Sequence, residues 1–315
     1  MAEAKGTAKK KLQQRRDEQF PNGKPVTQRP VMSITRGYRE AVALALDVPS
    51  SIFDSNFIVL CESEDSRQTF GLESTAQLAA ALRNVIMRDS GVQPVPAWVS
   101  GHEPDGRRLE SSSHLAIVPM AFVDNKYADG HLLGLAVLVP RSVTYGERAK
   151  MLSPVLFDKD NEPRKLRLTL AKVGEWNIER EGGFSPKASL RPLTYTQKNC
   201  LWASVTPVVL DRMPKSDRAR SPIHWREEVA GIVAQSCRNV GLPQPLAVRV
   251  EKTPFFRGSL RAMPGQGGFP LLREGSYQGH VCIEFEQDVA GPVLIGAGRF
   301  RGYGLMRPWK CEVGQ

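Results

Sequence analysis

The sequence predicts an α+β fold in which the element order β-α-β-β-α-β occurs twice. Short strand-like runs alternate with helical periodicity from residue 57 onward, and the same order of elements recurs in the second half of the chain. A glycine-rich segment precedes the last predicted strand. With 315 residues, the chain is long enough for two modest domains, each with its own core.

The first half supplies the first set of elements. A helix is capped by Ser74 or Thr75 and ends before Gly91. Its spacing places one apolar stripe toward a core, formed by Leu78, Ala81, Leu82, Val85 and Ile86. A second helix is expected over residues 145–156. The predicted strands cover residues 57–61, 115–123, 132–139 and 166–170.

The second half repeats this order without close sequence similarity to the first. A helix over residues 225–239 buries one apolar face and ends at Gly241. Its expected buried residues are Val229, Ile232, Val233 and Cys237. Predicted strands cover residues 202–210, 246–250, 281–285 and 305–309. Residues 257–279 are rich in glycine, proline and arginine and are expected to form a long exposed loop.

These patterns divide the chain into three parts. Residues 1–50 form a basic, flexible arm, with eight Lys/Arg against three acidic residues in the first 30. Order is expected to begin near Phe57. Residues 51–195 and 196–315 are then two tandem ferredoxin-like (RRM-type) domains, the second carrying the glycine-rich loop.

Composition limits the classes of function. The net charge of +10 and the pI near 9.5 favour a polyanionic partner such as nucleic acid. No apolar run is long enough for a membrane helix, and residues 1–16 are too polar for a signal peptide. The five cysteines are scattered singly, which argues against a zinc site or a disulfide framework and indicates a cytoplasmic protein without a metal or cofactor.

The stretch Gly296–Gly304 is the most informative one in the chain. Its glycines let the backbone approach a ligand closely and offer N–H groups to phosphate. Its cations and aromatic rings suit phosphate contacts and base stacking. The predicted RNA-binding residues are Gly296, Gly298, Arg299, Phe300, Arg301, Gly302, Tyr303 and Gly304. A dinucleotide-binding turn is excluded, because Arg301 occupies its third glycine position. A glycine-rich hairpin without a ligand remains the alternative, and burial of this segment would contradict the RNA-binding prediction.

Five colinear stretches resemble a known superfamily. They span about residues 95–309 and cover residues 99–106, 114–123, 128–136, 203–211 and 291–300. Together they resemble the CRISPR precursor-RNA processing endoribonucleases of the RAMP superfamily. More narrowly, they are similar to the C-terminal part of the fused backbone/processing subunit of type I-G (formerly I-U).

The resemblance implies metal-independent cleavage of CRISPR repeat RNA. The ribose 2′-hydroxyl attacks the adjacent phosphate and leaves a 2′,3′-cyclic phosphate and a free 5′-hydroxyl. The product hairpin at the 3′ end of the guide RNA then stays bound within a type I effector complex. The partners are thus CRISPR repeat or guide RNA and other effector subunits, with target DNA met only through the complex.

The candidate catalytic residues are His102, His114, Lys126 and Tyr127. A histidine suits the acid or base role because its pKa lies near neutrality, and a lysine can stabilise phosphate charge. His102 lies in the loop where superfamily members often place a catalytic histidine; the alternative is that it stabilises its own turn. For His114, a structural role at the strand start is favoured. An exposed turn explains Lys126 and Tyr127 equally well.

Two departures from the family pattern bear on function. The family often carries histidines where this chain has Asn125-Lys126-Tyr127. The RAMP domain that usually precedes this region is also missing, so a separate backbone subunit is expected, or that domain has been lost. A catalytically inactive guide-RNA-binding subunit is therefore the second hypothesis. A general RRM protein is the third, although neither third strand carries the aromatic motif of that class. The sequence does not define the repeat or its cleavage position.

Overall fold

The computed structural model describes Gln14 and residues 48–103, 105–107, 109, 114–170, 173–183, 185–265 and 267–310. Chain contacts separate Met1–Leu46 from one compact unit, Asp47–Gln315. The basic arm expected over residues 1–50 thus lies almost wholly outside the described residues. Order begins before Phe57, because Ser51 Oγ donates to Pro292 O at 2.5 Å and Phe53 is fully buried.

The first sheet has the strand order β2-β3-β1-β5-β4, and all its neighbouring strands are antiparallel. Its strands are β1 (Ile58–Glu62), β2 (Ala116–Ala121), β3 (Leu132–Leu138), β4 (Leu166–Thr169) and β5 (Glu175–Arg180). The accompanying helices are η1 (Leu72–Ser74), α2 (Thr75–Asp89), α3 (Ala97–Ser100) and α4 (Tyr145–Leu156). The helix predicted over 145–156 is confirmed.

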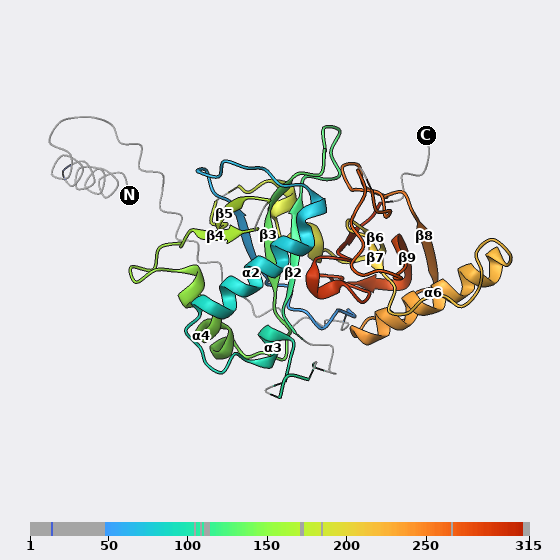
Figure 1. Cartoon of the computed structure of the whole chain (residues 1–315), viewed down its shortest axis with the longest axis horizontal. Coiled ribbons are helices and arrows are strands. Elements are labelled where there is room, and N and C mark those ends of the chain that lie inside the picture. Colours follow the sequence, from blue (N-terminus) through green and yellow to red (C-terminus); the bar gives the residue numbers. More distant parts are fainter. Residues whose placement is uncertain are drawn as a thin grey trace, which may run out of the picture. The chain divides into compact units, whose positions relative to one another are not determined.

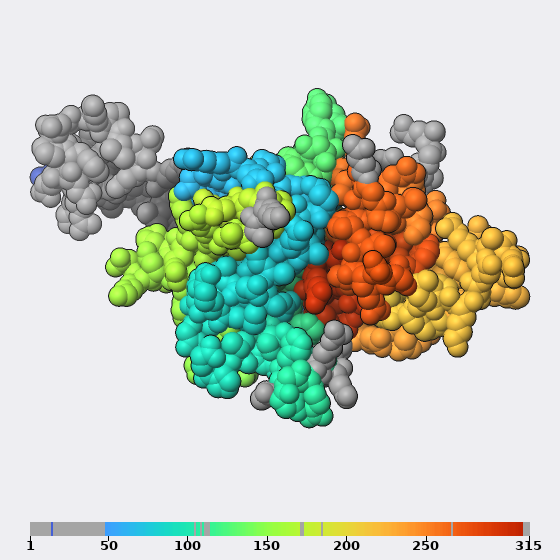
Figure 2. Space-filling view, viewed as in Figure 1, coloured from blue at the N-terminus to red at the C-terminus, as the bar shows by residue number. Residues whose placement is uncertain are grey.

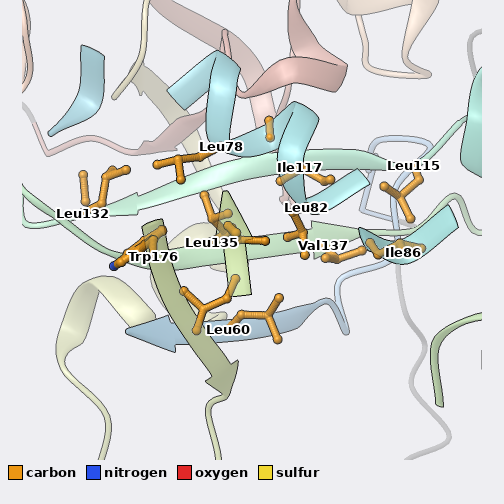
Figure 3. Packing of buried hydrophobic residues seen from close by; sticks show 14 of the residues in the cluster. Leu60, Leu78, Leu82, Ile86, Leu115, Ile117, Leu132, Leu135, Val137 and Trp176 are labelled. Carbon is orange, nitrogen blue, oxygen red and sulfur yellow. The ribbon is translucent and has the colours of Figure 1, made fainter. Parts of the chain in front are cut away.

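Helix α2 lies across this sheet (Figure 1), and its buried residues belong to the same apolar cluster as those of β2 and β3. Leu78, Leu82 and Ile86 lie over Leu135 and Val137 of β3, as Figure 3 shows. Every residue of β2 and β3 is buried. Because the i, i+4, i+8 spacing brings these leucine and isoleucine side chains to one side of the helix, the pattern predicted the contact face correctly.

The strand beside β1 differs from the prediction. The last strand was expected at residues 166–170, but that segment is the edge strand β4, and β5 pairs with β1 instead. Trp176 and Ile178 of β5 alternate with exposed or half-buried residues and enter the core. This period-two pattern is the signal that sequence analysis missed.

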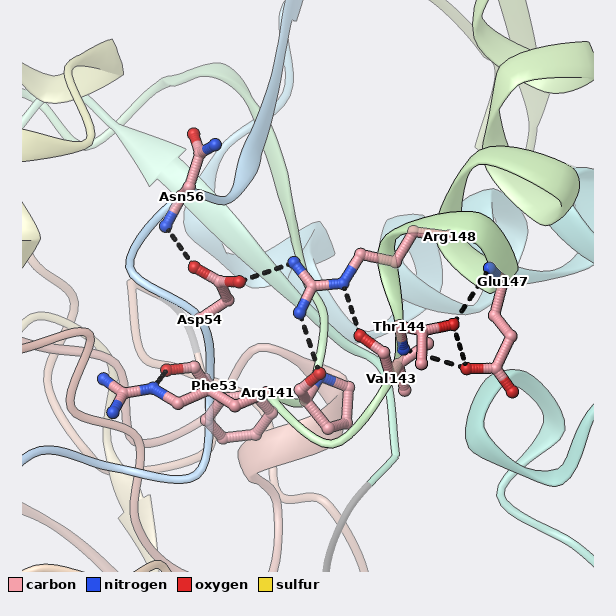
Figure 4. A network of polar contacts seen from close by, with 9 residues as sticks. Phe53, Asp54, Asn56, Arg141, Val143, Thr144, Glu147 and Arg148 are labelled. Atoms are coloured by element: carbon pink, nitrogen blue, oxygen red, sulfur yellow. Dashed lines mark hydrogen bonds and ion pairs between the residues drawn. The ribbon is translucent and has the colours of Figure 1, made fainter.

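A network of hydrogen bonds connects Asp54, in the segment before β1, with the turn that precedes α4 (Figure 4). Arg148 donates to Asp54 Oδ2 at 2.6 Å, to Val143 O at 3.0 Å and to Pro140 O at 3.1 Å. Thr144 and Glu147 form a capping box at the start of α4. The network therefore sets where α4 begins and holds residue 54 against it.

The second sheet contains β10-β6-β9-β7, with β8 also paired to β9. Its strands are β6 (Asn199–Ser204), β7 (Val208–Val209), β8 (Ala247–Glu251), β9 (Gln278–Val289) and β10 (Met306–Pro308). The helices of this half are η2 (Ala188–Leu190), α5 (Leu193–Thr196), α6 (Pro222–Asn239) and η3 (Arg299–Arg301). The predicted apolar face of α6 is confirmed, since all four expected residues are buried.

The second half departs from a complete β-α-β-β-α-β order between β9 and β10. The connecting residues 290–305 contain the short turn η3 in place of an α-helix. η3 packs on β2 and α2 of the first half. One buried cluster accordingly draws side chains from both sheets, including Ile117 and Leu135 from the first and Ala203, Cys282 and Tyr303 from the second half. In Figure 2 the C-terminal residues, in red, lie between the cyan and orange parts of the surface.

Candidate functional site

His102 is held at the end of the short helix α3. Gly101 ends that helix with a left-handed backbone (φ 76°), which glycine adopts without strain. Ser100 Oγ accepts the His102 N–H at 3.2 Å, and His102 Nδ1 lies 3.1 Å from Ser100 O. Because a carbonyl oxygen can only accept, this contact places the proton on Nδ1 and leaves Nε2 as a free acceptor. The exposed imidazole can therefore take a proton from a bound ligand.

His114 lies beside this loop, directly before β2. Its ring stacks on Phe300 with a centroid distance of 3.4 Å. Burial, aided by the charges of Arg83, Arg299, His102 and Arg301, lowers the pKa of His114 to about 3. The ring is thus neutral at physiological pH and lacks the acidic imidazolium proton that a general acid would transfer. This environment supports the structural role that the sequence favoured for His114 over its alternative role as a catalytic residue.

Three arginines lie close enough to His114 for their charges to lower its pKa. Arg83 comes from α2, and Arg299 and Arg301 come from η3. Arg299 is buried; it donates to Gly296 O at 2.9 Å and lies 3.9 Å from Asp211 Oδ1. Arg301 is exposed, which makes it the cation of η3 that can meet a phosphate.

The glycine-rich loop is packed against protein, and this burial contradicts the prediction that its glycine backbone binds RNA. Gly296, Gly298, Gly302 and Gly304 are all buried. The N–H of Gly296 donates to Ser236 Oγ, and the N–H of Gly304 donates to Pro207 O. The glycines allow a close backbone approach, as predicted, but what the backbone approaches is the protein itself. A Cβ at Gly302, for example, would overlap Thr75 of α2.

The aromatic rings of the loop also face the protein. Tyr303 is 1% exposed, its ring lies 4.9 Å from that of Phe269, and its hydroxyl donates to Pro270 O at 3.1 Å. Half-buried Phe300 contacts His114 and, edge-on, Phe53. The stacking role predicted for Tyr303 is therefore wrong for this conformation, since its ring has no free face.

Lys126 and Tyr127 lie in the connection between β2 and β3, away from both histidines. His114 precedes β2 and these residues follow it, and six residues of strand span about 20 Å. In Figure 1 this connection is at the top of the view, whereas α3 is at the bottom. Tyr127 is 72% exposed with Lys126 Nζ 4.7 Å from its ring centroid. The four predicted catalytic residues thus form two separate pairs.

Arg83 is the site residue that sequence analysis missed. Its guanidinium donates to Val99 O at 2.6 Å, Leu115 O at 2.8 Å and Phe300 O at 3.0 Å. The available signal was its position on α2, four residues after Ala79 and three before Ile86, which both face the core. A cation at such a position indicates a buried polar contact.

The described residues contain neither a metal-ligand cluster nor a membrane-spanning helix. Within them, no three or more His, Cys, Asp or Glu side chains gather as metal ligands would. None of the helices in that same part of the chain is long and apolar enough to span a bilayer.

Comparison with known proteins places this geometry in a family. Residues 63–308 match the family described as "CRISPR-associated protein, GSU0054 family". No curated protein matches the chain. A solved structure titled "Crystal structure of CRISPR RNA processing endoribonuclease Cas6b" covers 80% of this chain and 97% of its own, at 11% identity and a TM-score of 0.32, too low to support an argument. Because the family match extends over most of the chain and includes the histidine–arginine cluster and every strand of both sheets except β1, the protein belongs to the GSU0054 family of CRISPR-associated proteins.

Proposed function

We propose that the protein is a metal-independent endoribonuclease that binds and cleaves CRISPR repeat RNA. One observation carries the proposal: the exposed imidazole of His102, with a free Nε2, lies near His114, which three arginines also approach, in a CRISPR-associated protein. A base next to fixed positive charge is what transesterification of RNA requires.

The proposed chemistry uses His102 and Arg301. His102 Nε2 removes the proton of the ribose 2′-hydroxyl, whose oxygen then attacks the adjacent phosphorus. The bond from phosphorus to the 5′-oxygen breaks, leaving a 2′,3′-cyclic phosphate and a 5′-hydroxyl. Arg301 stabilises the charge that develops on the phosphorane oxygens. The leaving 5′-oxygen takes its proton from solvent or from protonated His102.

The second candidate is an inactive subunit that binds the guide RNA. The observation favouring it is the neutral, stacked state of His114, which leaves His102 without a second histidine to supply the leaving-group proton. Lys126 and Tyr127 lie beyond the far end of β2, too distant from His102 to supply that proton. Binding would then use exposed cations such as Arg301, with Arg257, Arg261 and Arg273 on the 257–279 connection.

The proposal extends to the fold and to the partners. Pairing orders β2-β3-β1-β5 and β8-β9-β6-β10 are the same permutation of strands, which supports two ferredoxin-like sheets. The product hairpin would stay bound at the 3′ end of the guide RNA in a type I effector complex, with a separate backbone RAMP subunit as partner. Type I-G is the subtype we propose, on the resemblance of residues 95–309.

The test is cleavage of the chain's own repeat RNA in EDTA. We expect one cut with a 2′,3′-cyclic phosphate end, and no cut in RNA carrying a single 2′-deoxy substitution at that position. Cleavage that depends on added divalent metal would contradict the mechanism. Tight binding without cleavage would support the inactive subunit, and absence of both would refute the RNA-processing role.

A further inference from the structure

Arg83 joins three separate chain segments through one guanidinium. Its Nη1 donates to Val99 O of α3, and its Nη2 donates to both Leu115 O and Phe300 O. These carbonyls come from the helix before His102, the start of β2 and the turn η3. Arg83 therefore connects the first half of the compact unit to the glycine-rich loop.

Each of the three carbonyls is close in sequence to a residue of the proposed site. Val99 precedes His102 by three residues, Leu115 directly follows His114, and Phe300 directly precedes Arg301. A shift of the guanidinium would consequently move the base and the phosphate-binding cation relative to each other. Such alignment matters, because a misplacement of about 1 Å can cost about 10²-fold in rate.

The contacts are unusual because they hold a largely buried cation by carbonyls alone. No described carboxylate forms an ion pair with Arg83. Burial and the charge of Arg301 lower the pKa of Arg83 to about 10, so it still carries its charge at neutral pH. The planar fork of guanidinium N–H groups can serve three acceptors at once, whereas a lysine ammonium offers one compact centre.

From these contacts we infer that Arg83 is a positioning residue that couples the glycine-rich loop to His102. It aligns Arg301 with His102 for the RNA cleavage proposed above, on which this inference rests. Arg83 does not itself touch the reacting atoms. Its effect is expected on the chemical step rather than on RNA capture.

The experiment compares Arg83→Ala, Arg83→Lys and the matched control Arg88→Ala in the full chain. Arg88 lies on the same helix but is exposed and pairs with Asp89. Single-turnover cleavage of repeat RNA is measured beside affinity for the uncleavable 2′-deoxy RNA. We expect Arg83→Ala to lower the rate by about 10²-fold while affinity stays near wild type. Arg83→Lys should recover only part of the rate, and Arg88→Ala should be unaffected.

Chemical rescue separates positioning from a general loss of structure. Low concentrations of guanidinium chloride should raise the cleavage rate of Arg83→Ala, whereas sodium chloride at equal ionic strength should not. A protein that is merely destabilised would lose activity further, because guanidinium is a denaturant. Wild-type cleavage by Arg83→Ala, or a parallel fall in rate and affinity without rescue, would overturn the inference and leave the proposed function intact. Absence of cleavage by the wild-type chain would refute the proposed function and, with it, this role for Arg83.

Discussion

His114 is the residue whose protonation state follows most directly from its surroundings. Its pKa is lowered from 6.5 to about 3 by burial and by nearby positive charge. Between these values the unfolded chain binds a proton that the folded chain does not, so the free energy of unfolding falls as pH drops from about 6.5 to about 3. His114→Gln should remove the contribution of His114 and make the free energy of unfolding vary less with pH over this range. Denaturant unfolding at several pH values measures it, and parallel curves for both proteins would contradict the described environment.

Arg301 and Tyr303 illustrate how burial separates neighbouring residues of one motif. Arg301 is exposed, so Arg301→Ala should weaken RNA binding and reduce the salt dependence of affinity by about one unit of slope. Tyr303→Phe should leave RNA affinity unchanged, because its ring already packs on Phe269. Titrations of RNA binding at several salt concentrations test the predicted effects of Arg301→Ala and of Tyr303→Phe. A large loss of affinity in Tyr303→Phe would show that the hydroxyl contacts RNA instead of Pro270 O.

The residues of the candidate site were only partly predictable. Polar loop context identified His102, and the structure brings His114 and the glycine-rich loop to it. Lys126 and Tyr127 were grouped with them because the connection between two adjacent strands is close to His114 in the predicted topology. In the structure the length of β2 separates the two pairs. Arg83 was missed because its position on α2 indicates only some buried polar contact, whereas its acceptors are carbonyls of distant segments that no local sequence pattern identifies.

At the scale of elements, amphipathic periodicity was the reliable guide. It predicted α2 and α6 with their buried faces, since each stripe follows from helical geometry alone, and it predicted the extent of α4. The pairing of strands was harder to predict from the sequence, and β5 was missed although it pairs with β1. Which of two short strands lies beside β1 depends on tertiary packing, and two such strands look alike locally.

The turn η3 provides an element-scale prediction. Gly302 has φ 86° and its position leaves no room for a Cβ beside Thr75 and Pro119. Gly302→Ala should lower the free energy of unfolding by at least about 1–2 kcal/mol, from left-handed backbone strain alone, and loosen η3 from α2. The control is Gly231→Ala on the exposed face of α6, where nothing lies within 4 Å; it should stabilise by about 0.5–1 kcal/mol. Equal effects of the two changes in denaturant unfolding would contradict the packing of η3.

For the molecule as a whole, the shared core predicts cooperative unfolding of residues 47–315. Tyr303, Ala203 and Cys282 of the second half belong to the same buried cluster as Ile117 and Leu135. Separation of the halves would expose this apolar surface to water. Trp176 and Trp202 lie in the first and second sheets, so tryptophan fluorescence and far-UV circular dichroism should report one coincident transition. Two resolved transitions would show that the halves are independent domains.

The twofold pattern of elements was visible in the sequence, whereas the contact between the halves was not. Glycines and apolar residues of the 291–305 connection suit approach to a ligand and approach to another part of the chain equally well. In this protein the connection approaches another part of the chain. Its turn η3 packs on β2, which would otherwise be an exposed edge strand.

The central claim, that His102 is the base of the proposed RNA-cleaving site, has one direct test. Single-turnover cleavage and hairpin affinity are measured for wild type, His102→Ala and the control His224→Ala, an exposed histidine on α6. The account predicts that His102→Ala loses about 10²–10⁴-fold in rate and still binds the hairpin, while the control matches wild type. Cleavage by His102→Ala at the wild-type rate would contradict it.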